Sequence, residues 1–294
     1  MNFVSGFTAI IGPPNVGKST LLNRILKAKI SIVSSKPQTT RNRILGIYNE
    51  TGYQIVFMDT PGIHKTRTAL HKSMVNSALA AFQEVDSLLL LIEMIHPNDP
   101  EIPLIIKNLK SIKKPCILAI NKIDLGPRDQ LLEIIDDFKI KYEFEAIIPV
   151  SALNGDGVDI LLEELKSRLV NGPQYFPADM KTDKPESFIV SEIIREKIYL
   201  YLKKELPYSS AVTVERIEEK TGKNMLFISG IIHVETDSQK GILIGRNGRM
   251  IKNIGQSARL DLEKFFGIKV YLDLAVKVDK NWSRDPKALS RLGY

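Results

Sequence analysis

The 294-residue sequence contains one cysteine, Cys116, so the chain cannot form an internal disulfide. Cys116 lies in the apolar stretch PCILAIN, and we interpret it as a core residue. Histidine is also scarce: the four histidines, His64, His71, His96 and His233, are not spaced as metal ligands. The single cysteine excludes a fold held together by internal disulfides, and the spacing of the histidines does not indicate a zinc site.

No apolar run is long enough to span a bilayer, because the longest, SLLLLIEMI from Ser87 to Ile95, has the length of a strand. The first residues lack the basic region and the small-residue cleavage site of a secretory signal, so the expected location is the cytoplasm. A composition of 44% hydrophobic and 26% charged residues is typical of a soluble globular protein. A chain of this length has room for two domains.

Positive charge is concentrated in the C-terminal third of the chain. Residues 188–294 hold 19 Lys and Arg against 13 Asp and Glu, whereas residues 1–187 hold 22 against 21. This asymmetry predicts an anionic partner for the C-terminal part. We favour nucleic acid over a membrane surface because no basic amphipathic helix with bulky apolar anchors is present. A basic surface that is only solvated is the alternative.

Short apolar runs alternate with amphipathic stretches between Phe7 and Leu169. The runs are FTAII, RILGIY, YQIVFM, SLLLLI, CILAIN and AIIPVS, and most are separated by helix-period segments such as STLLNRIL, TALHKSMVNSALAAF and GVDILLEELKSRL. Strands this continuously apolar are buried on both faces. The pattern predicts an α/β domain over residues 1–172, with a doubly wound, mostly parallel sheet that binds ligands at the carboxyl ends of its strands.

A change of pattern marks a second domain. Residues 173–187 contain three prolines and little apolar content, and we interpret them as a linker. Beyond them come a helix pattern from Phe188 to about Glu205, two strand-like runs, a glycine-punctuated loop with two helical stretches, RMIKNIGQSARLDLEKFF, and the closing strand KVYLDLAVKV. This order predicts a smaller α+β domain over residues 188–280, followed by a basic tail over 281–294.

The stretch GPPNVGKS, residues 12–19, fits the phosphate-loop motif GxxxxGK[ST], between a predicted strand and a predicted helix. Its glycines let backbone N–H groups face phosphate oxygens, and the start of the helix adds its positive dipole end. Lys18 is expected to contact the β and γ phosphates and the Ser19 hydroxyl to ligate Mg²⁺. The remaining residues expected at the phosphates are Asn15, Val16, Gly17 and Thr20.

Two later motifs indicate which base is bound. NKID, residues 121–124, ends the fifth apolar run. The Asp124 carboxylate can accept hydrogen bonds from guanine N1 and the 2-amino group, which adenine lacks. SAL, residues 151–153, ends the sixth run, and the Ala152 N–H can donate to guanine O6. A polar strand end without a ligand is the alternative for NKID. The residues expected at the base are Asn121, Lys122, Asp124, Ser151, Ala152 and Leu153.

The third apolar run ends in DTPG, residues 59–62. Asp59 fits the carboxylate that holds Mg²⁺ through water, and the Gly62 N–H fits a sensor of the γ phosphate. In the polar segment SSKPQTTRNR, Thr39 or Thr40 can supply a second protein ligand to Mg²⁺, and we select Thr40. The expected catalytic residues are therefore Lys18, Thr40 and Gly62, with Ser19, Thr40 and Asp59 at the metal.

The motifs GPPNVGKS, PQTTR, DTPG, NKID and SAL, in this order, resemble those of translation-factor-type GTPases and most closely the Era family, over the whole chain. The resemblance implies slow intrinsic hydrolysis, because Ile63 stands where many relatives have a glutamine that orients the attacking water. It also implies that K⁺ can bind partly through Asn15.

The C-terminal part contains GILIGRNGRMIKNIG, with GxxG at residues 245–248. Apolar residues before it, a predicted helix after it and basic residues around it resemble a KH domain, whose GxxG loop clamps about four single-stranded nucleotides. A glycine hinge is the alternative. The expected RNA-binding residues are Lys240, Ile244, Gly245, Arg246, Asn247, Gly248, Arg249 and Lys252. Trp282 fits either base stacking or packing within the domain.

These features together predict a GTP-hydrolysing switch that binds single-stranded RNA, with GTP or GDP and Mg²⁺ as cofactors. The resemblance to Era implies that the RNA is the 3′ end of 16S ribosomal RNA and that the process is maturation of the small ribosomal subunit. We expect a monomer, and peripheral membrane contact is left open. Two other functions remain: an ATP-dependent P-loop enzyme, which NKID opposes, and an RNA-binding assembly protein with a dead nucleotide site, which the intact Lys18 and Ser19 oppose.

Overall fold

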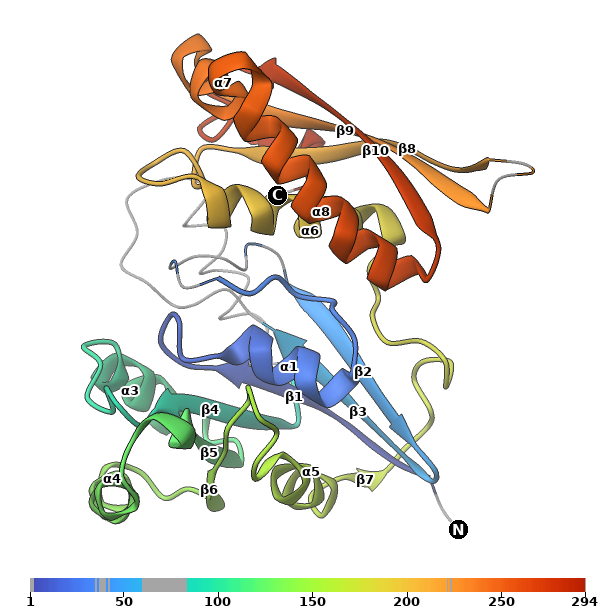
Figure 1. Cartoon of the computed structure of the whole chain (residues 1–294). Coiled ribbons are helices and arrows are strands. Elements are labelled where there is room, and N and C mark those ends of the chain that lie inside the picture. The colour runs from blue at the N-terminus through green and yellow to red at the C-terminus, as the bar shows by residue number, and fades with distance from the viewer. Residues whose placement is uncertain are drawn as a thin grey trace. The chain divides into compact units, whose positions relative to one another are not determined.

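The computed structural model describes residues 3–34, 36, 41, 43–59, 84–220, 222 and 224–293. These residues form two compact units, of which unit 1 ends at Asp183 and unit 2 begins at Lys184. Each unit has a β-sheet of its own. Figure 1 shows the order of the elements along the chain.

The sheet of unit 1 contains all six predicted apolar runs as strands (Figure 1). They are β1 (Val4–Ile11), β2 (Ile44–Glu50), β3 (Tyr53–Asp59), β4 (Ser87–Glu93), β5 (Cys116–Asn121) and β6 (Ala146–Pro149). The strand order is β2-β3-β1-β4-β5-β6, and only β2 among these runs antiparallel to its neighbour. The predicted doubly wound, mostly parallel sheet is confirmed. A further short strand, β7 (Val170–Asn171), pairs antiparallel with β1 and was not predicted, because two residues carry no periodicity.

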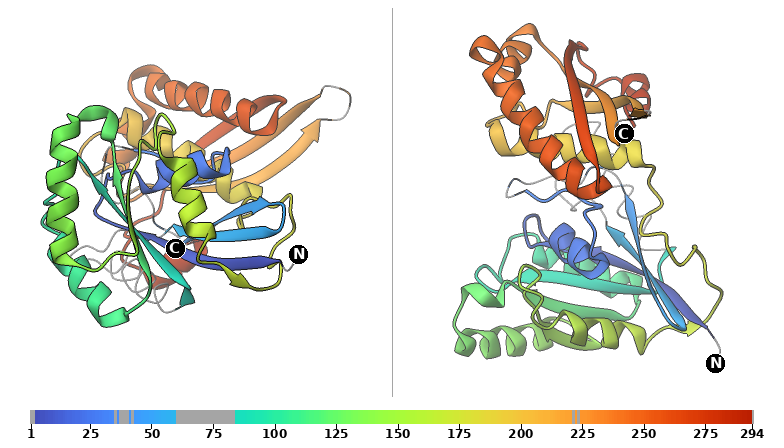
Figure 2. Two further views of the ribbon diagram at one scale, coloured as in Figure 1. Left: turned by 90° about the horizontal axis from the view of Figure 1, so that it is seen from below. Right: turned by 45° about the vertical axis from the view of Figure 1, so that its right-hand side comes forward.

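Helices cover both faces of this sheet (Figure 2). They are α1 (Lys18–Leu26), α3 (Ile102–Ile112), α4 (Arg128–Lys141) and α5 (Val158–Lys166). On the face that carries α3 and α4, Cys116 is 1% exposed and burial raises the pKa of its thiol to about 12, so its interpretation as a core residue is confirmed. On the other face, a Cβ at Gly46 would lie 2.6 Å from Leu22 Cδ1, so the missing side chain lets α1 pack closely on β2. The expected helix TALHKSMVNSALAAF lies outside the described residues.

Parallel strands bring the ends of separate motifs to one edge of the sheet. Ile10 of β1 pairs with Asp59 of β3, and Glu93 of β4 pairs with Asn121 of β5. The phosphate loop, DTPG and NKID therefore all begin at the carboxyl edge, where a doubly wound sheet binds its ligand.

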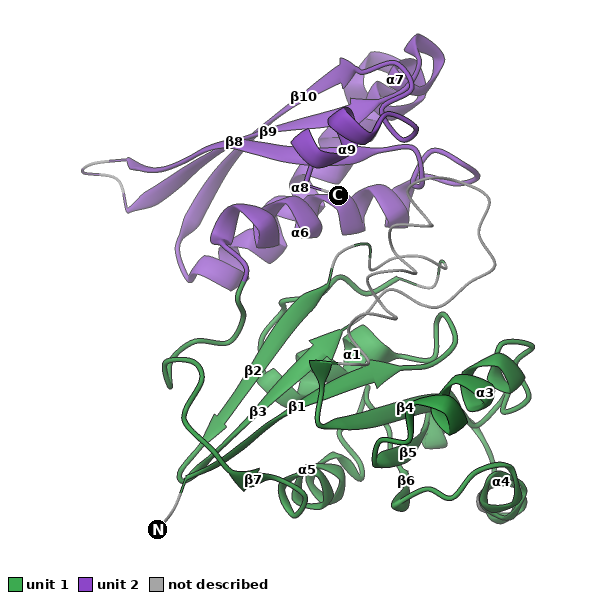
Figure 3. Ribbon diagram, turned by 180° about the vertical axis from the view of Figure 1, so that it is seen from behind, with its two compact units in different colours: residues 1–67, 71–183 green, residues 68–70, 184–294 purple. Residues whose placement is uncertain are grey.

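The linker residues bind back to the sheet of unit 1. Gln54 of β3 is fully buried, donates to the Phe176 carbonyl at 2.9 Å and accepts from the Phe176 N–H at 3.1 Å. Further along, the Ile47 N–H of the edge strand β2 donates to the Lys181 carbonyl at 2.9 Å. Figure 3 accordingly shows the described residues up to Asp183 in the colour of unit 1.

Unit 2 has the predicted order of helix, two strands, two helices and strand, but residues 249–266, which were expected to hold two helical stretches, form one helix, and the other helix precedes the glycine-rich turn. The strands β8 (Ala211–Lys220), β9 (Met225–Val234) and β10 (Lys269–Val278) form a sheet in the order β10-β9-β8, with β9 and β10 parallel. The helices are α6 (Glu186–Tyr201), α7 (Asp237–Ile244) and α8 (Arg249–Phe266), followed by a short α9 (Pro286–Arg291). Helix α6 begins two residues before the expected Phe188, because Glu186 and Ser187 already have helical backbone geometry. Figure 2 shows α6 and α8 against the same sheet.

Trp282 packs inside unit 2, since it is 1% exposed and its Nε1 donates to the Ser209 carbonyl at 3.1 Å. The next residue, Ser283, donates through Oγ to Glu235 Oε1 at 2.7 Å. The packing interpretation is confirmed and the base-stacking interpretation is wrong. The residues after β10 are thus part of the fold of unit 2.

Candidate nucleotide site and nucleic-acid interface

The phosphate loop needs glycine at two positions. Gly12 and Gly17 have φ values of 145° and 102°, which L side chains rarely adopt. A Cβ at Gly12 would lie 2.1 Å from the Leu91 carbonyl oxygen, and a Cβ at Gly17 would lie 2.3 Å from Asn121 Nδ2. The loop can therefore curl between β1 and α1 only without side chains at these two positions.

Lys18 is folded into the same loop. Its Nζ donates to the carbonyl oxygens of Gly12 at 2.8 Å and Pro13 at 2.7 Å, and the residue is 9% exposed. Burial lowers the pKa of Lys18 to about 8, against the opposing influence of the Asp59 carboxylate. Phosphate oxygens beside this ammonium group would stabilise its charged form.

Two oxygen groups suited to Mg²⁺ meet beside the loop. Ser19 Oγ donates to Asp59 Oδ2 at 3.0 Å, and Asp59 is fully buried at the end of β3. Hydroxyl and carboxylate oxygens are hard ligands of the kind that Mg²⁺ prefers, so the residues present fit this ion. A third residue reaches the same oxygen: Ser31 Oγ donates to Asp59 Oδ2 at 2.9 Å. The expected residues Thr40 and Gly62, and Ile63 with them, lie outside the described residues.

Asn121 joins the phosphate loop to the loop SAL. Its Nδ2 donates to the Val16 carbonyl at 2.7 Å, and its Oδ1 accepts from the Ala152 N–H at 2.9 Å. Asn121 is 2% exposed, so these bonds are shielded from water. The amide group of Asn121 thus fixes the spacing between the phosphate part and the base part of the site.

The rest of NKID turns out of the sheet toward solvent. Lys122 adopts a left-handed conformation with φ of 63°, and its ammonium group pairs with the Glu93 carboxylate. The short 3₁₀ helix η1 (Ile123–Leu125) follows. Asp124 is exposed in this turn, where its carboxylate is accessible to a base.

The loop SAL is held by one of its own residues and by one residue that the sequence did not single out. Ser151 is fully buried, and its Oγ accepts from the Asn154 N–H at 3.1 Å. Arg24 of α1 donates through Nε to the Ala152 carbonyl at 3.2 Å and through Nη2 to the Leu153 carbonyl. Sequence reasoning missed Arg24 because it belongs to no motif and bonds to residues more than a hundred positions away.

Histidines take no part in this site among the described residues. His96 is exposed, and His233 lies in unit 2 between Thr213 Oγ1 and Asp279 Oδ2, each 2.8 Å from one of its ring nitrogens. Burial lowers the pKa of His233. Within the described residues, no group of three or more His, Cys, Asp or Glu side chains could hold a metal ion.

The GxxG segment of unit 2 is a tight turn between α7 and α8. Gly245, Asn247 and Gly248 have φ values of 71°, 53° and 72°, and Arg246 and Asn247 are exposed. A Cβ at Gly245 would lie 2.7 Å from Met250 Cβ, whereas a Cβ at Gly248 would meet nothing within 4 Å. Gly245 therefore allows Met250 to pack against the turn from the inside, whereas the space beside Gly248, on the outer side of the turn, is open.

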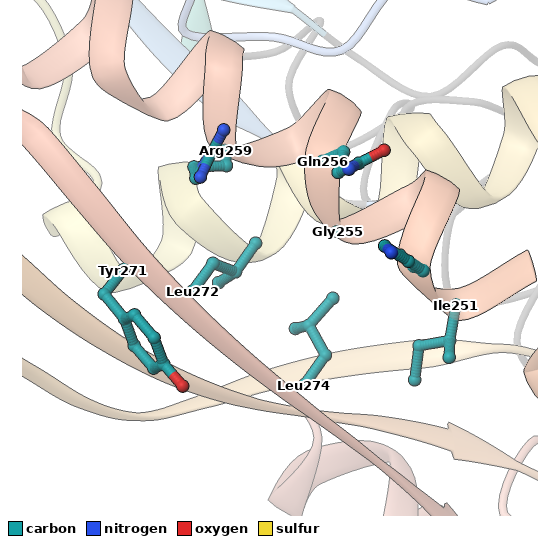
Figure 4. Close-up of a pocket in the computed structure, with 8 residues that line it drawn as sticks. Ile251, Gly255, Gln256, Arg259, Tyr271, Leu272 and Leu274 are labelled. Carbon is teal, nitrogen blue, oxygen red and sulfur yellow. The ribbon is translucent and has the colours of Figure 1, made fainter. Parts of the chain in front are cut away.

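A groove of about 320 Å³ lies between α8 and β10 (Figure 4). Apolar side chains from both elements and polar side chains from α8 line it: Ile251, Lys252, Gly255, Gln256, Arg259, Tyr271, Leu272 and Leu274. Of the expected RNA-binding residues only Lys252 lines this groove. The others lie in α7, in the GxxG turn and at the start of α8. The sequence did not indicate the groove, because its lining residues are spread over α8 and β10. Only the fold places these residues on the two sides of one groove.

None of the helices in the described part of the chain is both long enough and apolar enough to cross a membrane.

Comparisons with protein families match each unit separately. Residues 7–122 match the model of the 50S ribosome-binding GTPase family, and residues 205–283 match the KH domain family. Over 99% of its length, the chain is 50% identical to the GTPase Era of Syntrophus aciditrophicus, of which it covers 95%. It is 51% identical to the GTPase Era of Geobacter metallireducens, with 99% of this chain and 98% of that protein covered.

Two solved structures of Era have the same fold as this chain over nearly its whole length. A point variant of Aquifex aeolicus Era bound to GDP and AlF₄⁻ matches with a TM-score of 0.95 and 41% identity, covering 99% of both chains. An Era in complex with MgGDPNP and nucleotides 1506–1542 of 16S ribosomal RNA matches with a TM-score of 0.94 and 41% identity, again covering 99% of both chains.

Proposed function

The chain belongs to the Era family of GTPases, and from this we propose that it binds and hydrolyses GTP in unit 1 and binds single-stranded 16S ribosomal RNA through unit 2, in maturation of the small ribosomal subunit. The observation that carries the proposal is the meeting of the phosphate loop, Asp59 and Asn121 at one edge of the sheet. The relative solved with MgGDPNP and ribosomal RNA supports it.

In this proposal the loop residues hold the phosphates and the metal. The Lys18 ammonium group exchanges the Gly12 and Pro13 carbonyls for phosphate oxygens, which carry more charge. Ser19 and Asp59 hold Mg²⁺, with Asp59 acting through water. Bound Mg²⁺ neutralises charge that develops on the phosphates during hydrolysis.

The base is selected at the exposed end of the site. The Asp124 carboxylate accepts from guanine N1 and the 2-amino group, and the Ala152 N–H, which Asn121 Oδ1 holds in place at 2.9 Å, is assigned to guanine O6 as a shared donor. A nucleotide without the 2-amino group leaves the carboxylate only partly satisfied, which is why we propose guanine over adenine.

Three roles rest on the motifs alone. We propose that Thr40 ligates Mg²⁺, that the Gly62 N–H senses the γ phosphate, and that K⁺ bound partly by Asn15 supports a hydrolysis step that is slow because of Ile63. Loss of the γ phosphate would then release the Thr40 and Gly62 segments and change how RNA is bound.

RNA would lie along the GxxG turn and the adjoining groove. The open side of Gly248 admits a sugar–phosphate backbone next to Arg246 and Arg249. The apolar residues Ile251 and Leu274 offer a surface to unstacked bases (Figure 4). We further propose that the protein acts as a cytoplasmic monomer at the small ribosomal subunit, while peripheral membrane contact stays a prediction.

Nucleotide competition tests the first half of the proposal. Labelled GDP bound to the protein should be displaced by GTP, whereas ATP should need at least about a hundredfold higher concentration. Displacement by ATP at similar concentration would indicate the ATP-dependent alternative. Absence of phosphate release from GTP, even with RNA and K⁺ present, would indicate the dead-site alternative.

A gel shift with a short single-stranded RNA from the 3′ end of 16S ribosomal RNA tests the second half. The double substitution Arg246→Asp with Asn247→Asp should abolish the shift and leave GDP affinity nearly unchanged. The matched control, Arg284→Asp with Asn281→Asp, makes the same charge change at exposed positions outside the GxxG turn and the groove. Equal RNA binding by both variants would contradict the assignment of the GxxG turn.

A further inference from the structure

We propose that Ser31 is a positioning residue for the carboxylate that holds magnesium, and that Asn23 fixes Ser31 in place. The inference rests on the magnesium site of Ser19 and Asp59 proposed above. Ser31 belongs to none of the nucleotide-binding motifs, and it precedes the polar segment that contains Thr40.

Two hydroxyl groups converge on one carboxylate oxygen. Ser31 Oγ donates to Asp59 Oδ2 at 2.9 Å, and Ser19 Oγ donates to the same oxygen at 3.0 Å. Ser31 is 1% exposed and Asp59 is fully buried, so water does not compete for the bond between them. A hydrogen bond from a shielded hydroxyl to a buried carboxylate is strong and directional.

The Asn23 side chain makes three hydrogen bonds to the backbone at Ile30 and Ser31. Its Oδ1 accepts from the backbone N–H groups of Ile30 and Ser31, both at 3.0 Å, and its Nδ2 donates to the Ser31 carbonyl at 2.7 Å. Asn23 lies four residues after Ser19 on α1, one turn along the helix. The helix that supplies the metal ligand therefore also fixes the residue that orients the metal carboxylate.

A bound metal ion would affect the hydrogen bonds of the two serines to Asp59 differently. Ser19 would be a ligand of Mg²⁺, so its bond to Asp59 would compete with the ion. Ser31 is not assigned as a ligand, so its bond to Asp59 Oδ2 would remain and would hold the carboxylate in its orientation. Outer-shell groups that orient a metal site typically contribute 10- to 100-fold to metal affinity, and Ser31 is such a group for the carboxylate that is proposed to hold Mg²⁺ through water. Serine adds no charge, so the contribution comes from orientation.

The test measures how much Mg²⁺ is needed to slow the release of fluorescent GDP. In Ser31→Ala, the Mg²⁺ concentration that gives half of the slowing should rise about tenfold. GDP affinity in EDTA should stay as in the unchanged protein, because the phosphate loop is intact. Ser34→Ala is the matched control, since within the described residues the Ser34 hydroxyl accepts a local bond from the Lys36 N–H at 3.1 Å and does not reach Asp59, and it should leave the Mg²⁺ midpoint unchanged.

A double-mutant comparison tests the part assigned to Asn23. Asn23→Ala should raise the Mg²⁺ midpoint as Ser31→Ala does, and the double variant should be no worse than the more affected single variant, because Asn23 acts through Ser31. Additive effects would overturn this part of the inference.

The remaining outcomes separate this inference from the proposed site. If GDP release from the unchanged protein does not respond to Mg²⁺, the magnesium site itself is wrong. If the unchanged protein responds and Ser31→Ala has the same midpoint, the site stands and the role of Ser31 is overturned. A Ser31→Ala variant with a lower melting temperature and weaker GDP binding in EDTA, but an unchanged Mg²⁺ midpoint, would assign Ser31 a purely structural role.

Discussion

Arg24 shows how a single side chain can shape the base end of the site without touching a motif of the phosphate loop. Its guanidinium group donates to the carbonyls of Ala152 and Leu153, the two peptides that follow the N–H expected at guanine O6, and so holds the loop that carries this N–H. Hydrogen bonds from a charged donor contribute about 1.5–3 kcal/mol each when they are shielded. Arg24 lies at the edge of the site, so we expect a value at the lower end of this range.

Arg24→Ala should therefore weaken GDP binding about tenfold, which corresponds to about 1.4 kcal/mol. Arg168→Ala is a matched control, because Arg168 also donates to backbone carbonyls, those of Glu164 and Glu145, but Glu145 lies at the amino end of β6 whereas SAL follows its carboxyl end. Isothermal titration with GDP measures both. Equal affinities of the two variants would show that Arg24 does not position the loop.

Asp124 is the residue on which base choice depends in our proposal. In Asp124→Asn, the amide can donate to the carbonyl that xanthine carries where guanine has its 2-amino group. The variant should lose at least about a hundredfold in GDP affinity and gain affinity for xanthosine diphosphate. Competition between the two nucleotides measures the change, and a preference for GDP as strong as in the unchanged protein would refute the assignment.

Motif residues could be recognised from the sequence because their chemistry depends on local spacing. Gly12 and Gly17 were identified by the phosphate-loop pattern, and the structure gives the reason in their positive φ values and close neighbours. Ser31 and Arg24 could not be found in this way, because their partners lie 28 and 128 residues away. Only the fold brings such pairs together.

At the scale of elements, apolar runs predicted every strand of both sheets except the two-residue β7, since burial on one or both faces leaves a clear pattern in longer runs. The linker was harder to interpret. Its prolines and polar residues indicated a free connection, yet the Leu45 N–H donates to Asp183 Oδ1 at 3.0 Å and Gly46 forms a β-bridge with Thr182. Backbone bonds to an edge strand need no apolar pattern, so sequence periodicity does not report them.

Gln54 is the buried anchor of this linker, and its replacement tests whether the anchoring matters. Gln54→Leu removes the bonds to Phe176 and leaves backbone groups unsatisfied, which should destabilise unit 1 by about 1–3 kcal/mol. Trypsin should then cut faster after Lys181. Gln174→Leu is the control, because Gln174 bonds to the same carbonyl from an exposed position where water can replace it. Equal cleavage of both variants would show that the linker does not depend on Gln54.

At the scale of the whole molecule, the division at Asp183 places each ligand on its own folding unit. The two sheets share no strand among the described residues, and the phosphate loop and GxxG turn belong to different units. A ligand that binds only the folded form stabilises the unit that holds it. Each unit should therefore respond to its own ligand in thermal unfolding.

Calorimetry should show two transitions, of which Mg²⁺ and GDP raise only one. At a hundred times the dissociation constant, GDP adds about 2.7 kcal/mol, which corresponds to a rise of roughly 5–10 °C for a unit of this size. Short single-stranded RNA should raise only the other transition. Asp124→Asn should abolish the shift with GDP and keep the shift with RNA. A single transition whose melting temperature rises with either ligand would show that the two units unfold together. Ligand binding to one unit would then stabilise both.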